Sequence, residues 1–196
     1  MSSPELDTRE RILKATLQLL EKHQGQGVRI EDIAQMAGVS RQAVYLHFGT
    51  RPALLIATAR YLDDVLRLSE RIQRTCSAPN GVEALDAYVE FWANYIPDIY
   101  GLAKALMAVR ETDEAAAAVW EDRMGAVYGG CLSITQSLAR DGLLAPGWTA
   151  DSAADFFFAA LSLPTWETLT TERGWTKEQY IARTQRALKR AFLCTD

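Results

Sequence analysis

One short stretch of this sequence concentrates the side chains best suited to chemistry. They are Arg41, Gln42, Tyr45 and His47. At helical spacing, Val44 and Phe48 lie four residues apart and can face a core. The four polar side chains then point outward, as donors suited to base edges and phosphate oxygens. The stretch is therefore either a helix that reads DNA or the solvated face of an all-helical protein.

The elements around this stretch must position it. Asp7 followed by Glu10 is a capping-box pattern that opens a first helix. A second short helix is expected over about 30–37, and Ser40 is a suitable N-cap for a third that ends near residue 48. The turn at Gly38 joins these two. Two short helices joined by a sharp turn are typical of a helix-turn-helix, whose second helix enters the major groove.

The rest of the chain also predicts helices. Strand alternation is nowhere sustained, so we expect an all-α fold of about nine helices. Pro97 is expected to start a helix, and Pro164 to kink or divide the helix that contains it. Beyond residue 48 the expected helices are 52–74, 81–95, 97–110, 112–141, 149–172 and 176–192.

Composition limits the possible classes of protein. The 196 residues carry a net charge of −4, but the first 60 residues hold eight basic and six acidic side chains. This indicates a slightly basic head on an acidic body. We expect no membrane-spanning segment and no signal peptide. The three widely spaced cysteines suggest neither a disulfide framework nor a zinc site, so we expect no metal or cofactor and a cytoplasmic location.

Residues 37–55 read Ala-Gly-Val-Ser-Arg-Gln-Ala-Val-Tyr-Leu-His-Phe-Gly-Thr-Arg-Pro-Ala-Leu-Leu. This segment resembles the signature of the TetR family of bacterial transcriptional regulators, and the resemblance extends over about residues 8–60. It implies a three-helix DNA-binding head at 1–50. It also implies a helical body at 51–196 that binds a small effector and forms a homodimer. The partners implied are a palindromic double-stranded operator and an effector that releases a repressor from it.

The expected DNA contacts combine this resemblance with the outward face of the third helix. Arg41 and Gln42 are expected to read bases, and Tyr45, His47 and Arg51 to contact phosphates. Arg29 departs from the family pattern, since a hydroxyl N-cap is common there, but its own charge could reach a phosphate. The full expected set is Arg29, Ser40, Arg41, Gln42, Ala43, Tyr45, Leu46, His47 and Arg51.

The body offers candidate residues for the effector and for the dimer. Large aromatic and methionine side chains on the central helices suit a pocket for a largely apolar or aromatic ligand, although such stripes are also typical of a core. These are Phe91, Trp92, Tyr95, Tyr100, Met107, Trp120, Met124, Tyr128 and Phe158. The expected dimer interface, which could instead be plain core, is Phe156, Phe157, Leu161, Leu188 and Phe192.

Two alternatives remain open for the function. A DNA-binding protein without an effector would have the same head. A helical enzyme is disfavoured, because the only two histidines, His23 and His47, are far apart in sequence. No metalloprotease, phosphate-loop or nucleophile-elbow motif is present. We therefore expect no catalytic activity.

Overall fold

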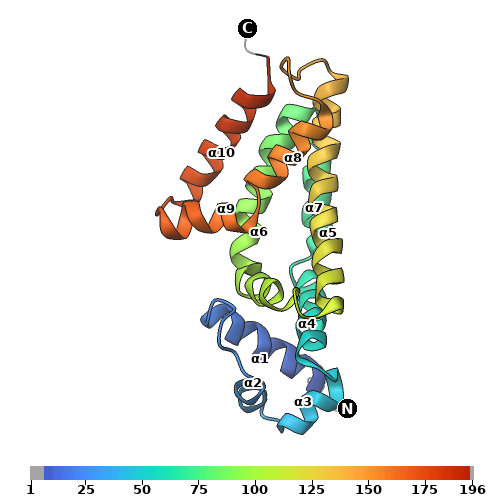
Figure 1. Cartoon of the computed structure of the whole chain (residues 1–196), viewed down its shortest axis with the longest axis vertical. Coiled ribbons are helices and arrows are strands. Elements are labelled where there is room, and N and C mark those ends of the chain that lie inside the picture. The colour runs from blue at the N-terminus through green and yellow to red at the C-terminus, as the bar shows by residue number, and fades with distance from the viewer. Residues whose placement is uncertain (1–6, 195–196) are drawn as a thin grey trace, which may run out of the picture. The chain divides into compact units, whose positions relative to one another are not determined.

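The computed structural model describes residues 7–194 (Figure 1). All the secondary-structure elements longer than an isolated bridge in that range are helices. The α-helices are α1 (Thr8–Lys22), α2 (Ile30–Ala37), α3 (Arg41–Phe48), α4 (Arg51–Val65), α5 (Leu68–Cys76), α6 (Gly81–Val109), α7 (Glu114–Arg140), α8 (Ala150–Ala160), α9 (Leu163–Glu167) and α10 (Lys177–Phe192). A π-helical turn, η1 (Thr168–Glu172), follows α9. The expected all-α class is confirmed.

The helix expected over 52–74 is in fact two helices. Helix α4 ends where Leu66 donates its backbone N–H to the carbonyl of Leu62, and Arg67 then adopts a left-handed φ of 48°. A left-handed residue stops an α-helix, and glycine is the residue that usually marks such a stop. Because arginine stands here instead, the sequence offered no break signal.

The two helices expected on either side of Pro97 are one continuous helix, α6, with the proline inside it. Proline removes one helical hydrogen bond and normally ends or kinks a helix. Here Ala93, Ile96 and Leu102 are all buried around the proline, so packing on both sides outweighs its local preference. At Pro164 the expected division is confirmed. Helix α8 ends at Ala160, and Ser162 caps a new helix, α9, with the proline in its first turn.

The chain divides by its internal contacts into two compact units. The first unit contains the residues up to Leu68 together with Asp98–Asp122, and the second contains Ser69–Pro97 together with Arg123 onward. Helices α6 and α7 each contribute residues to both. The boundary expected between residues 50 and 51 separates a DNA-binding part from an effector-binding part. A division by internal contacts does not test it, so it stays a prediction.

The core of the first unit joins α1, α2 and α3 to α4 and to the end of α6. Leu54, Leu55 and Leu62 of α4 and Leu106 of α6 are buried in the same cluster as Ile12 of α1. Helix α6 approaches α1 closely at Gly101. A Cβ atom placed there would lie 2.6 Å from the carbonyl carbon of Leu20, so only glycine permits this spacing. Helices α1, α2 and α3 therefore share one apolar core with α4 and the end of α6.

The core of the second unit contains aromatic side chains from α6, α8 and α10. The ring of Phe157 lies 5.9 Å from that of Tyr88 and 6.3 Å from that of Phe192, and all three are buried. An ion pair of 2.7 Å between Lys189 and Asp86 also joins α10 to α6. Helix α10 is thus held by apolar packing and by charge.

Candidate nucleic-acid interface

The turn between α2 and α3 has the geometry that its sequence predicts. Gly38 adopts φ 65° and ψ 39°, the left-handed conformation that glycine accepts without strain. The N–H of Val39 then donates to the carbonyl of Ala34 at 3.0 Å. The Ser40 hydroxyl accepts the N–H of Ala43 at 3.1 Å, which caps α3. Ser40, an expected DNA contact, therefore already has a role at the start of α3.

Arg11 of α1 fastens this turn, and sequence reasoning did not find it. Its Nε and Nη2 atoms donate to the carbonyl of Ala37 at 3.1 and 2.8 Å, and Nη2 also donates to the carbonyl of Gly38 at 3.1 Å. These carbonyls at the end of α2 lack helical partners, and a cation suits that end of a helix. The contact spans 26 residues, so no local pattern announces it.

Helix α3 is anchored by few side chains. Val44 is its one buried residue, and half-buried Phe48 packs against the same core. The guanidinium carbon of Arg9 lies 5.4 Å from the centre of the Phe48 ring. The inward orientation expected of Val44 and Phe48 is confirmed.

The rest of α3 faces outward. Arg41, Gln42 and His47 are exposed, and so are two large side chains that a solvated helix rarely displays. Tyr45 is 43 % exposed and Leu46 is 84 % exposed. A short helix that leaves both a polar set and apolar side chains uncovered has the character of a contact surface.

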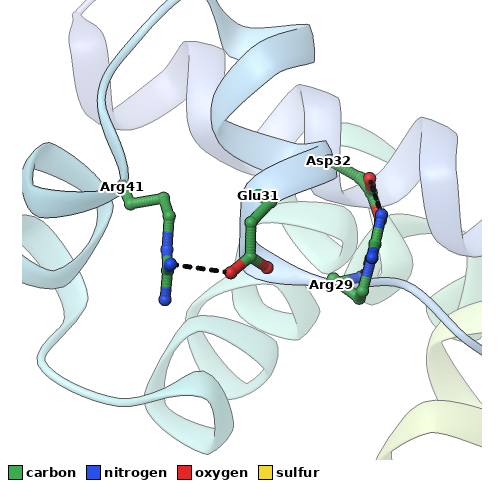
Figure 2. Close-up of polar contacts among 4 residues, drawn as sticks. All are labelled: Arg29, Glu31, Asp32 and Arg41. Atoms are coloured by element: carbon green, nitrogen blue, oxygen red, sulfur yellow. Dashed lines mark hydrogen bonds and ion pairs between the residues drawn. The ribbon is translucent and has the colours of Figure 1, made fainter.

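Two of the three arginines expected to contact DNA, Arg29 and Arg41, form ion pairs within the chain (Figure 2). Arg41 Nη1 lies 2.9 Å from Oε1 of Glu31, and the Arg29 guanidinium makes two bonds of 3.0 Å to the carboxylate of Asp32. The hydrogen bond from Arg29 holds the pKa of Asp32 below its usual range. Asp32 also accepts the backbone N–H of Arg29 at 3.3 Å, while the Arg29 side chain makes no capping bond.

Arg51, the third expected cation, is half-buried at the start of α4. Its Nη2 donates to the carbonyl of Val28 at 3.4 Å, between α1 and α2. Because a carbonyl is neutral, this hydrogen bond does not offset the positive charge of Arg51. Thr50 caps α4 by accepting the N–H of Ala53 at 3.2 Å, and Pro52 occupies a first-turn position that needs no N–H donor.

Residues 12–58 match the family model of the bacterial regulatory proteins of the tetR family, at its N-terminal domain. The match runs from α1 through α2, the turn and α3 into α4. The matched segment is about a quarter of the 196-residue chain, so this similarity concerns its N-terminal part. The matched family is described as one of regulatory proteins.

Relatives in sequence match part of the chain. The uncharacterized HTH-type transcriptional regulator YerO of Bacillus subtilis (strain 168) is 36 % identical over 55 residues, 28 % of this chain and 19 % of YerO. The nucleoid occlusion factor SlmA of Shewanella denitrificans is 31 % identical over 65 residues, 33 % of each chain. The chain thus matches no more than a third of the length of either relative.

Solved structures with the same fold extend over nearly the whole chain. A protein of Saccharomonospora viridis assigned as a transcriptional regulator, crystallised with choline, has a TM-score of 0.82 at 18 % identity and covers 96 % of this chain and 99 % of its own. FadR of Bacillus subtilis, in complex with stearoyl-CoA, has a TM-score of 0.72 at 12 % identity, with coverages of 92 % and 97 %. At these identities the likeness concerns the fold.

The expected effector residues divide between the two units. Tyr100, Met107 and Trp120 belong to the first unit, and Phe91, Trp92, Tyr95, Met124, Tyr128 and Phe158 to the second. In the second unit Phe91 and Tyr95 are stacked with ring centres 5.4 Å apart, and the Arg71 guanidinium carbon lies within 5.8 Å of both rings. Tyr88 adjoins this cluster, 6.0 Å from Trp92. Sequence reasoning singled out neither Arg71 nor Tyr88.

The expected dimer residues are mostly internal to one chain. Phe157, Leu161, Leu188 and Phe192 are at most 3 % exposed within the single chain. Phe156 differs, with half of its surface exposed. Of the expected set, Phe156 is therefore the side chain that a second subunit could cover directly.

Other features of the described residues bear on ligands. Among the side chains that the structure describes, no group of three or more could hold a metal ion. No helix in the described part is long and apolar enough to cross a membrane. Cys131 and Cys194 are free thiols, and burial raises the pKa of Cys131 to about 12. The side chain of Cys76 lies outside the described part.

Proposed function

We propose that this chain is a sequence-specific DNA-binding transcriptional regulator that reads its site with α3. The observation that carries this proposal is the outward face of α3, which is exposed and rich in polar side chains. Buried Val44 holds the helix in place, and Arg11 holds the turn before it by a hydrogen bond to the carbonyl of Ala37. Arg41 and Gln42 stand in the first turn of α3, the part of a recognition helix that contacts base edges. Tyr45, His47 and Arg51 would contact phosphates.

A homodimer on a palindromic site is part of this proposal. One helix of eight residues contacts only a few base pairs. Two copies whose reading helices lie about 34–36 Å apart would reach successive major grooves on one face of the duplex. We place the interface on the exposed surfaces of α8 and α10. Phe156 of α8, which contacts Trp148 and Phe192 in its own chain, is its apolar centre.

The experiment that tests DNA binding is selection of duplexes from a random library by the purified full-length chain, followed by sequencing. We expect enrichment of one palindrome whose half-sites are spaced by about one helical turn, because a two-fold dimer imposes its symmetry on the site. Recovery of the same sequences that the library yields without protein would contradict the function.

We propose further that a small, largely apolar or aromatic effector binds in the second unit and weakens DNA binding. Proteins of the same fold bind choline and stearoyl-CoA, so the fold accommodates small ligands. In this chain the Phe91–Trp92–Tyr95 cluster supports such a site. The buried indole Nε1 of Trp92 has no hydrogen-bond partner among the described residues, which leaves a donor for a ligand. A constitutive DNA-binding protein would lack this response.

A compound that binds this cluster is expected to weaken operator binding about 5- to 150-fold, the usual range of allosteric coupling. The reason is that a ligand shifts the protein toward the arrangement that it binds better. The measurement is operator affinity at fixed salt across a panel of apolar compounds, alongside tryptophan fluorescence. Trp92→Phe should abolish the response, and Trp166→Phe, on α9, serves as the matched control. Ligand binding that leaves operator affinity unchanged would favour the constitutive alternative.

A further inference from the structure

We propose that Glu31 is a specificity-determining residue, which restrains Arg41 from binding phosphates indiscriminately and leaves it able to read a base. This inference rests on the proposed DNA-binding function. It concerns an acidic side chain beside the proposed DNA-reading helix. A negative charge at this position repels the phosphates of DNA, so it calls for an explanation.

The geometry assigns Glu31 to Arg41 specifically (Figure 2). Glu31 lies in the first turn of α2, Arg41 is the first residue of α3, and their charged atoms are 2.9 Å apart. The neighbouring acid, Asp32, is bound by both nitrogens of the Arg29 fork. Each acid of α2 therefore pairs with a different arginine, and the partner of Glu31 is Arg41.

The pair is exposed and can open. The Arg41 side chain is 58 % exposed and that of Glu31 is 46 % exposed, so water screens their attraction. A single contact, through Nη1, is made to Glu31. A guanidinium has five N–H donors, so the others stay available to the two acceptors of a guanine while the pair persists.

A phosphate contact has a different electrostatic balance. Attraction to the DNA backbone depends on net positive charge and on the counterions that this charge displaces. With Glu31 in place, Arg41 brings no net charge to a phosphate, and the carboxylate repels it. Base reading depends on the direction of the donors, which Glu31 preserves. Glu31 therefore weakens non-specific binding more than operator binding.

Glu31→Gln should reveal this difference. On a duplex of scrambled sequence we expect affinity to rise about 3- to 8-fold per protomer at about 0.1 M salt, as for one additional phosphate contact. The slope of log affinity against log salt should steepen by about 0.9 per protomer. On the selected operator the rise should be smaller, so the ratio of operator to scrambled affinity falls. Glu21→Gln, on exposed α1 surface of the same unit, is the control for net charge.

A second pair of variants shows whether Glu31 acts through Arg41. In an Arg41→Gln background, Glu31→Gln should change scrambled-duplex affinity no more than Glu21→Gln does. Equal gains from Glu31→Gln and Glu21→Gln in the wild-type background would overturn the inference, as would an unchanged affinity ratio. Those outcomes leave the proposed function intact, whereas failure of the wild-type chain to select any duplex contradicts that function. Thermal unfolding of each variant verifies that the fold is retained.

Discussion

Arg41→Ala is expected to weaken operator binding by about 1–3 kcal/mol per half-site, roughly 5- to 150-fold, and by more across both halves of a palindrome. Arg41 is the cation at the start of α3, and its side chain is more than half exposed. Arginine pairs with guanine through two parallel donors, which no other contact of α3 replaces. Discrimination against the wrong base should therefore fall together with affinity at that position.

Tyr45 provides the comparison that separates base reading from backbone contact. Tyr45→Phe removes one hydroxyl donor, and we expect similar weakening on operator and scrambled duplexes, because phosphate contacts carry no sequence information. Affinities measured at one fixed salt concentration, by titration of labelled duplexes, compare the variants. Neither side chain is buried, so thermal stability should change little. An Arg41→Ala/Tyr45→Ala double variant with wild-type operator affinity would exclude α3 as the reading helix.

Phe157→Ala is expected to destabilise the fold by about 3–5 kcal/mol, because it removes a fully buried ring and leaves a cavity. That ring meets Tyr88 of α6 and Phe192 of α10, so its loss loosens three helices together. Urea unfolding at one fixed protein concentration measures the effect, since the proposed dimerisation would make apparent stability depend on concentration. A cost below about 1 kcal/mol would contradict the placement of Phe157 at the centre of this core.

Phe156 is the matched control, one residue away on the same helix. It is half exposed, so Phe156→Ala should cost the isolated chain much less than Phe157→Ala. Phe156→Glu should instead raise the dissociation constant of the dimer, because it places a charge in an apolar contact. Sedimentation across a concentration series measures this. A Phe156→Glu variant as strongly dimeric as the wild type would place the interface elsewhere.

The sequence by itself determined the features that depend on neighbouring residues. The N-cap at Ser40 acts over a few residues, as does the left-handed turn at Gly38. The inward position of Val44 follows from helical spacing alone. These local rules were sufficient for the all-α class and for the outward face of α3. One local pattern was only half correct, since Asp7 caps α1 but Glu10 pairs with Lys14 instead of completing the box.

Only the tertiary structure decided the features that depend on distant partners. Arg11 reaches a turn 26 residues away, and Glu31 meets Arg41 because the turn brings two helix starts together. Phe156 and Phe157 are chemically identical neighbours, yet one is exposed and the other buried. Pro97 remains inside a helix because burial on both sides outweighs one lost hydrogen bond. In each case the deciding energy comes from contacts that the local sequence does not specify.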